Sequence, residues 1–144
     1  MEKKPQSLQN HTKLDPSFHL FLMPVALLLL IAAIYNLYQN LTLSAVAHLV
    51  AAVWAIIALF KIRTYALKVQ DRVIRLEERL RFEKLLPPAL NARFYELTEQ
   101  QIIALRFASD GEVPGLVEKT LAGSLPPKGI KQAVQNWRPD YWRV

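Results

Sequence analysis

The chain of 144 residues contains no cysteine, which excludes disulfide bonds, thiolate nucleophiles and cysteine-ligated zinc or iron–sulfur sites. It has only four glycines, and they form no glycine-rich phosphate-binding loop. Its three histidines, His11, His19 and His48, are far apart and include no H-x-x-x-H metal-binding pair. Because hydrolytic triads and metal sites need clustered groups of this kind, we predict no catalytic residues, no metal site and no enzyme activity.

A second absence is that of charge, since the 45 residues at 16–60 include no Asp, Glu, Lys or Arg. Two apolar segments in this stretch are separated by a short polar segment at residues 36–42. A helix needs about 20 apolar residues to cross a bilayer. We therefore predict two transmembrane spans, at about residues 18–38 and 43–60, joined as an antiparallel hairpin.

The charged residues are concentrated after the second apolar segment. Residues 61–144 hold 15 of the 18 Lys and Arg and 10 of the 12 Asp and Glu. Within 61–84, eight Lys or Arg stand against four Asp or Glu, a bias expected on the cytoplasmic side of a membrane and near anionic lipid headgroups. The arm at 1–17 is also basic, so we predict that both termini are cytoplasmic and the turn lies outside. This location explains the net charge of +6 better than nucleic-acid binding does.

Residues 61–86 contain neither glycine nor proline, so the second span is expected to continue as a juxtamembrane helix that ends at Pro87 and Pro88. Apolar residues in this segment recur at steps of four, three and four, as in the a and d positions of a coiled coil. This apolar seam consists of Val69, Val73, Leu76 and Leu80. Two heptads are too few to identify a coiled coil. The apolar seam either pairs with another chain, as in a homodimer, or docks on the helices that follow, and we favour docking.

Charged residues around the apolar seam have the spacing of ion pairs along one helix. Asp71 precedes Arg75 by four residues, and Glu77 precedes Arg81 by four. Glu77 and Glu78 lie in a run of alternating charge, which is typical of a solvated helix face. We therefore expect these side chains to face water.

Residues 87–144 are predicted to form a small helical module. Thr98 and Gln101 have the spacing of a capping box that begins a helix, and Gly123 fits the C-terminal cap of a later one. A last short helix is expected to carry apolar residues on one face. These residues are Ile130, Val134 and Trp137. No segment alternates with a period of two, so no sheet is expected.

The predicted fold class is all-α, with a two-helix transmembrane hairpin, a long juxtamembrane helix and a small cytoplasmic helical module. The expected divisions are a cytoplasmic N-terminal arm at 1–17, the hairpin at 18–60, the juxtamembrane helix at 61–86 and the module at 87–144. This organisation follows from where the charges and the prolines fall.

The second span has a narrow face of small residues at helical spacing. This small-residue face consists of Ser44, Ala47, Ala51, Ala55 and Ala58. Small residues let two helices approach closely in lipid, so we predict that this face packs against another helix. The first span is the simplest partner, and a second copy or another subunit is the alternative.

His48 lies within the second span, where an ionisable side chain is a candidate for function. A neutral imidazole at this position is suited to ligate haem or a chlorophyll-type pigment. The more ordinary interpretation is a hydrogen bond to Asn36, to Ser44 or to a neighbouring helix. His19 is not a second ligand from the same chain, because a rise of 1.5 Å per residue places it about 20 Å away in depth.

The C-terminal segment is rich in aromatic residues and arginine, which are enriched in protein interfaces and in the headgroup region of membranes. The residues concerned are Trp137, Arg138, Tyr141, Trp142 and Arg143. We predict that this segment docks on a partner or on the membrane. The alternative is that Trp137 completes the core of the module and the tail lies on it.

Three short motifs resemble those of an uncharacterised bacterial family of two-span membrane proteins. They are LEERLR at 76–81, ALRFASD at 104–110 and WRPDY at 137–141, and the likeness extends to DPSFH at 15–19. The resemblance covers most of the chain. It implies a bacterial source, and hence the inner membrane, and the same architecture, but no activity.

The sequence therefore predicts a membrane-anchored interaction protein, an accessory or structural subunit of a larger membrane complex. Its expected partners are the lipid bilayer and other membrane subunits. One alternative is a haem- or pigment-carrying subunit that uses His48. Another is a sensor or enzyme at the membrane surface, for which the sequence offers no residues to nominate.

Overall fold

The computed structural model describes residues 6–9 and 14–140, and every regular element in them is a helix. The predicted all-α class is confirmed. The described residues form no strand, apart from one isolated antiparallel bridge between Ala108 and Trp137. They divide into two compact units, residues 14–68 in the first and residues 6–9 with 69–140 in the second.

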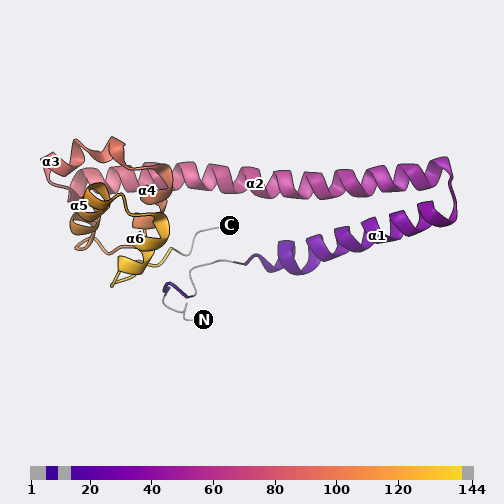
Figure 1. The fold of residues 1–144 in the computed structure, drawn as a ribbon, viewed down its shortest axis with the longest axis horizontal. Coiled ribbons are helices and arrows are strands. Elements are labelled where there is room, and N and C mark those ends of the chain that lie inside the picture. The colour runs from indigo at the N-terminus through magenta and orange to yellow at the C-terminus, as the bar shows by residue number, and fades with distance from the viewer. Residues whose placement is uncertain (1–5, 10–13, 141–144) are drawn as a thin grey trace. The chain divides into compact units, whose positions relative to one another are not determined.

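The first unit consists of two helical segments and the N-terminal part of a third, and the second unit contains the shorter helices (Figure 1). In chain order they are the π-helix η1 (Ser17–Leu22), α1 (Met23–Gln39), α2 (Leu43–Leu85), α3 (Pro88–Asn91), the 3-10 helix η2 (Phe94–Glu96), α4 (Glu99–Leu105), α5 (Val113–Gly123) and α6 (Pro127–Ala133).

The first unit begins with a side-chain cap. The carboxylate of Asp15 accepts hydrogen bonds from the backbone N–H groups of Ser17 and Phe18, at 3.0 and 3.3 Å. These N–H groups are at the start of the helix and have no carbonyl partner within it, so the side chain satisfies them. The helix changes from π to α hydrogen bonding at Met23, next to Pro24, which has no N–H to donate. The short π-helical segment therefore ends directly before a residue that cannot donate a backbone hydrogen bond.

The turn between α1 and α2 is short, as predicted, and the hydroxyl of Thr42 caps the start of α2. It accepts a hydrogen bond from the backbone N–H of Ala45 at 3.2 Å. Figure 1 shows α1 and the adjoining part of α2 running side by side in opposite directions. At their other end, Arg63 lies 3.8 Å from the Asp15 carboxylate and 5.6 Å from the ring centre of Phe18. These contacts close the open end of the hairpin.

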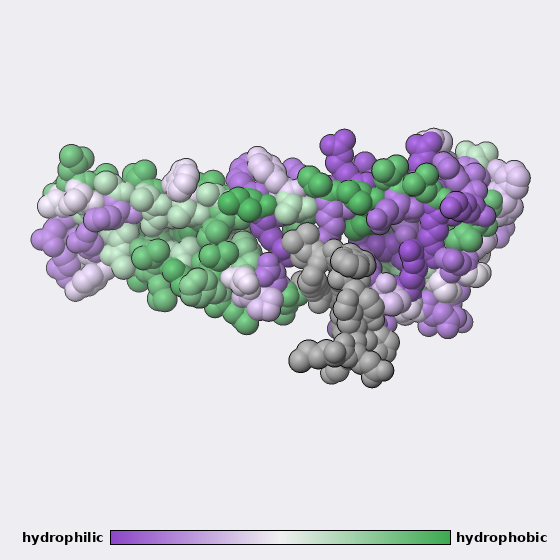
Figure 2. All heavy atoms as spheres, turned by 180° about the vertical axis from the view of Figure 1, so that it is seen from behind, coloured by the Kyte–Doolittle hydropathy of each residue, from purple (hydrophilic) through white to green (hydrophobic). Residues whose placement is uncertain are grey.

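Two helical segments are long and apolar enough to cross a membrane, namely residues 17–39 and the 43-residue helix α2. Most of their large apolar side chains are exposed, and Figure 2 shows hydrophobic residues over most of the visible surface of the first unit. As expected from the absence of glycine and proline at 61–86, α2 continues past residue 60 without a break to Leu85. One helix of 43 residues thus contains both the second apolar segment and the predicted juxtamembrane helix.

The second unit is built on the C-terminal part of α2, around which α3 to α6 are gathered (Figure 1). As predicted, α2 ends immediately before the two prolines. The predicted capping box is confirmed: the Gln101 N–H donates to the Thr98 hydroxyl at 3.3 Å, and the Gln101 side chain accepts from the Thr98 N–H at 2.8 Å. The core between these helices has the largest fully buried side chains. They include Phe82, Leu105, Phe107, Val113, Val117 and Ile130.

The last helix is shorter than the sequence indicates. α6 ends at Ala133, and Val134 already has an extended backbone, so Trp137 is not on its face. The following residues instead pair with the segment after α4: the Ser109 N–H donates to the Asn136 carbonyl at 3.1 Å, and the Arg138 N–H to the Phe107 carbonyl at 2.7 Å. These bonds compete with further helical turns and bring the C-terminal segment against α4. A second difference is at α5, where Ser124, and not Gly123, adopts the left-handed conformation, with φ of 47°.

Candidate interaction site

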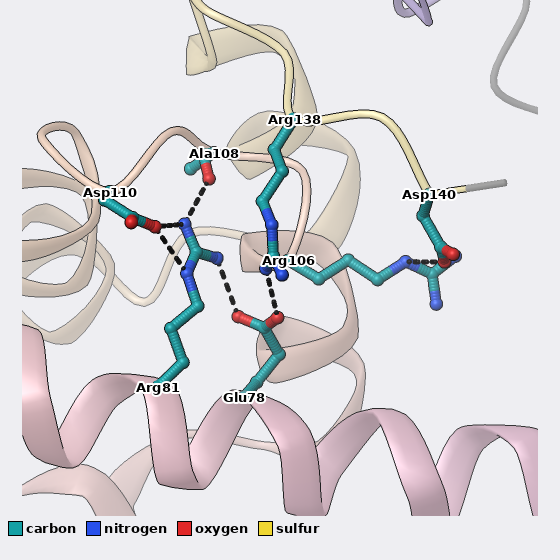
Figure 3. Close-up of polar contacts among 7 residues, drawn as sticks. All are labelled: Glu78, Arg81, Arg106, Ala108, Asp110, Arg138 and Asp140. Atoms are coloured by element: carbon teal, nitrogen blue, oxygen red, sulfur yellow. Dashed lines mark hydrogen bonds and ion pairs between the residues drawn. The ribbon is translucent and has the colours of Figure 1, made fainter. Parts of the chain in front are cut away.

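Three segments that are far apart in the sequence meet in one cluster of charged side chains in the second unit (Figure 3). They belong to the three motifs, at residues 76–81, 104–110 and 137–140. We call the six residues involved the ion-pair cluster. It consists of Glu78, Arg81, Arg106, Asp110, Arg138 and Asp140.

Glu78 on α2 is at the centre of the ion-pair cluster, and only 4 % of its surface is exposed. Its carboxylate accepts hydrogen bonds from Arg81 at 2.9 Å and from Arg138 at 3.0 Å. Such charge-assisted bonds compensate for removing a carboxylate from water. The prediction that Glu78 faces water was therefore wrong, because its two partners come from outside the local helix pattern as well as from within it.

Arg81 connects α2 to the segment after α4. Its guanidinium donates to the carbonyl of Ala108 at 2.7 Å and to the carboxylate of Asp110 at 2.8 Å. Ala108 lies three residues after the end of α4, so Arg81 pairs with a backbone acceptor outside any helix. The expected pair of Arg81 with Glu77 is replaced by these contacts and by Glu78.

Arg106 and Asp140 form the other side of the ion-pair cluster. Arg106 is 7 % exposed, its Nε lies 3.5 Å from Asp140 Oδ2, and its guanidinium stacks 4.5 Å from the ring centre of Phe107. The backbone of Asp140 also exchanges two hydrogen bonds with the side chain of Gln6, at 2.8 and 3.0 Å. Gln6, near the start of the chain, therefore contacts the same cluster.

The ion-pair cluster joins α2, the end of α4 and the C-terminal segment by charge. It has three arginines and three acidic residues, and each acidic residue contacts an arginine. Among the residues that the structure describes, no three His, Asp or Glu side chains gather as metal ligands would. What this arrangement provides is a fixed connection between segments, because its charges are already paired with one another.

The apolar seam lies on a different face of α2 and is exposed. The exposed fractions of its four residues range from 49 % to 61 %, whereas Ile74 and Phe82 on the docking face are buried. The prediction that the apolar seam docks on the following helices was therefore wrong. The module docks through the face that carries Phe82 and Glu78, where the Glu78 carboxylate has two arginine partners.

Three residues of the apolar seam line a groove of about 720 Å³ beside the module. Its apolar lining includes Val73, Leu76 and Leu97, and Arg72, Arg75 and Arg79 line it as well. Arg75 pairs with Glu99, and Arg79 donates to the Tyr95 hydroxyl at 2.6 Å. The expected pair of Asp71 with Arg75 is thus replaced by a contact with α4.

The helix η2 borders this groove and has an exposed pair of its own. The guanidinium of Arg93 donates two hydrogen bonds to the Glu96 carboxylate, at 2.8 and 2.7 Å. The hydrogen bond from Arg93 lowers the pKa of Glu96, and the same bond raises the pKa of Arg93. Both groups are therefore charged at neutral pH.

In the first unit, the buried alanines of α2 lie beside the predicted small-residue face. Ala45 and Ala52 are buried, while Ser44, Ala47 and Ala51 are exposed. Ala55 and Ala58 are half-buried. The contact within the hairpin thus centres on residues one position away from the predicted face, which stays largely uncovered.

His48 and Asn36 line the same groove of about 460 Å³ between α1 and α2. Ala51 and Ala55 of the small-residue face also line it. The hydroxyl of Ser44 lies within hydrogen-bond distance of the Thr42 hydroxyl, at 3.0 Å, and not of His48. The structure therefore brings His48, Asn36 and two of the predicted packing residues to one groove.

Two of the five C-terminal docking candidates fall in the described part of the chain. Trp137 is half-buried and packs on Phe107 with ring centres 5.0 Å apart, and Arg138 belongs to the ion-pair cluster. The other three, Tyr141, Trp142 and Arg143, lie outside the described residues.

The sequence identified one member of the ion-pair cluster, Arg138, and missed the other five. A signal was present, because each of the three motifs contains both an arginine and an acidic residue. Only Glu78 and Arg81, three residues apart on α2, have a local helical spacing, whereas Arg138 lies 60 positions after Glu78. Only the tertiary fold brings the motifs together.

One family model, described as Family of unknown function (DUF6526), matches residues 1–144. The comparison with curated proteins and the comparison with solved structures found no match. The predicted resemblance to an uncharacterised family is confirmed.

Proposed function

The chain belongs to this family of unknown function, and we propose that it is a membrane-anchored interaction protein, an accessory or structural subunit of a larger membrane complex. The observation that carries this proposal is the exposed apolar surface of two long helices. Large side chains such as Leu28, Ile31 and Trp54 are more than half exposed on them. A surface of this extent needs lipid or protein to cover it.

The charges support one orientation in a bacterial inner membrane, with both termini in the cytoplasm. The basic segment at 61–84 would lie next to anionic lipid headgroups. Because the chain has no cysteine, one introduced cysteine reports one position. In intact spheroplasts, a membrane-impermeant maleimide should label Asn40→Cys in the turn and not Glu118→Cys in α5. Labelling in the reverse order would overturn the orientation.

The uncovered small-residue face supports contact with another helix. Ala51 is exposed and lines the groove with His48, so a bulky residue there would keep a neighbouring helix away. We expect Ala51→Leu to dissociate the native complex in mild detergent. Val50→Leu is the matched control, because Val50 is exposed on the same helix and does not line that groove.

Native gel electrophoresis after mild extraction tests the proposal itself. We expect the chain to migrate in a complex with other subunits, which mass spectrometry of the excised band would identify. Migration as a lone 16.5 kDa chain at every detergent concentration would overturn it.

A cofactor-carrying subunit is the second candidate, because His48 lines a groove rather than a packed contact. Neutral imidazole there would ligate haem or a pigment. An absorption band in the purified protein that disappears in His48→Ala, at unchanged protein yield, would favour this candidate. A colourless preparation from fully occupied membranes would remove it.

A further inference from the structure

The apolar seam is a face of α2 that the module leaves uncovered. Its residues follow one another at steps of four, three and four, and all are about half exposed. The second unit has already buried its own core through Phe82 and the ion-pair cluster on another face. The folding of a single chain therefore leaves the apolar seam exposed.

We propose that the apolar seam pairs with that of a second copy in a parallel, two-stranded coiled coil. This inference rests on the proposed function, and it identifies a second copy of the chain as one partner at the cytoplasmic surface of the membrane. Val73 and Leu80 take a positions and Val69 and Leu76 take d positions, which are the positions that form the core of such pairs. The pairing ends at Glu83, which occupies the next d position.

The charges beside the apolar seam specify the parallel orientation. In a parallel pair, a g residue faces the e residue five positions later on the other helix. Arg72 then faces Glu77 of the second copy, and because the pair is symmetric this attraction occurs twice. In an antiparallel pair, g residues face g residues, so arginine would face arginine and Glu77 would face Glu77 of the second copy.

The next g and e residues do not oppose this arrangement. Arg79 would face Lys84 of the second copy, but its guanidinium is already held by the Tyr95 hydroxyl and by Glu83, at 2.6 and 3.3 Å. Arg72 and Glu77, in contrast, are both exposed beside the apolar seam. The favourable pair is therefore the one that is presented to a second helix.

Anchoring in one membrane favours the same orientation. Two copies that insert in the same sense hold their α2 helices parallel, and confinement to a bilayer raises their effective concentration. That confinement compensates for the short length of the pairing region, since two heptads alone are a weak coiled coil. Three of the four seam residues, Val69, Val73 and Leu76, line the groove of about 720 Å³ and are not covered by the module.

Single cysteines test the pairing in membranes from cells that express the full chain. Val69→Cys and Leu76→Cys occupy successive d positions, and Lys68→Cys is the control, because Lys68 is exposed one residue from the apolar seam. Under mild oxidation we expect covalent dimers from both d variants and about tenfold less from the control, since Cα atoms more than about 7 Å apart are not bridged.

A charge exchange in the Leu76→Cys background gives a second readout. Arg72→Glu and Glu77→Arg should each lower the dimer yield by about five- to tenfold, because each replaces two attractions by two repulsions. The double variant Arg72→Glu with Glu77→Arg should restore the yield. Circular dichroism should show equal helix content in all of them, since both residues are exposed.

Three outcomes overturn the proposal: equal dimer yields from the d variants and Lys68→Cys, dimers from only one d position as in an antiparallel crossing, or no restoration in the double variant. A covalent adduct of another protein in place of the dimer overturns it as well. Carbonate extraction keeps this result separate from the proposed function. A chain that stays in the membrane without cross-linking refutes the dimer alone, whereas a chain that leaves the membrane refutes the anchoring.

Discussion

Glu78→Gln is the substitution that most directly tests whether the ion-pair cluster holds the module on α2. The side chain keeps its size and one oxygen acceptor but loses its charge. Arg81 is then left with Asp110 and the Ala108 carbonyl, and Arg138 loses its carboxylate partner. The change therefore removes the ion pair between α2 and the C-terminal segment and weakens the contact that holds Arg81 in position.

The expected loss of stability is about 2 kcal/mol. Breaking a fully buried ion pair from one side costs about 3–5 kcal/mol, and a hydrogen bond to a charged group contributes about 1.5–3 kcal/mol. We use a value near the lower end of the second range for two reasons. The Arg138 side chain is 51 % exposed and can regain water, and Arg81 keeps a second carboxylate. A change of about 2 kcal/mol raises the unfolding equilibrium constant about 30-fold.

Urea unfolding of the full chain in detergent micelles measures this loss. Trp137 packs on Phe107 next to the cluster, so its fluorescence reports the module once Trp54 and Trp142 are replaced by Phe. The midpoint should fall while the slope with urea stays the same. Glu83→Gln is the control, because its ion pair with Arg79 is half exposed and its loss should change stability by less than about 0.5 kcal/mol. Equal midpoints for both variants would refute the reasoning.

Three further predictions use the same chain in micelles. Thr98→Ala should lower module stability by about 1 kcal/mol in urea because it removes the capping box, and an unchanged midpoint would contradict that role. Ser124→Gly should raise stability by about 1 kcal/mol, since Ser124 has a positive φ that glycine adopts without strain; a lower midpoint would show that the serine side chain matters more. Asp15→Ala should speed hydrogen exchange in η1 about fivefold by removing its cap and the Arg63 pair, while exchange in α5 stays the same. Protection of η1 at the original level would refute this cap.

Features that depend on neighbouring residues along the chain were predictable from the sequence. The end of α2 before Pro87 follows from the covalent chemistry of proline, and the start of α4 follows from the Thr98 capping box. The two apolar helices follow from length and composition. Each of these signals lies within a few residues of the feature it predicts, so no knowledge of the tertiary fold is needed.

The docking face of α2 was not predictable in the same way. The periodicity of Val69, Val73, Leu76 and Leu80 is stronger than that of the face the module covers, which includes Glu78 and Arg81. A hydropathy pattern treats those charges as solvated, because it does not contain the partners that come from 27 to 60 residues away. The predicted ion pairs Asp71–Arg75 and Glu77–Arg81 do not form, for the same reason. Tertiary partners such as Glu99 and Asp110 compete with an interaction of about 0.2–0.5 kcal/mol and replace it.

The two faces of α2 should also differ in how they respond to dilution. The ion-pair cluster joins parts of one chain, so its strength is independent of the concentration of the protein in the membrane. In the proposed dimer the apolar seam joins two chains, so the fraction of paired seams depends on that concentration. Extraction into a large excess of detergent should therefore separate the copies while Glu78 still holds the module on α2. Cross-linking at Leu76→Cys should fall on dilution, and the urea midpoint of the module should stay constant. A midpoint that falls together with the cross-linking would mean that the second copy is part of the module's fold.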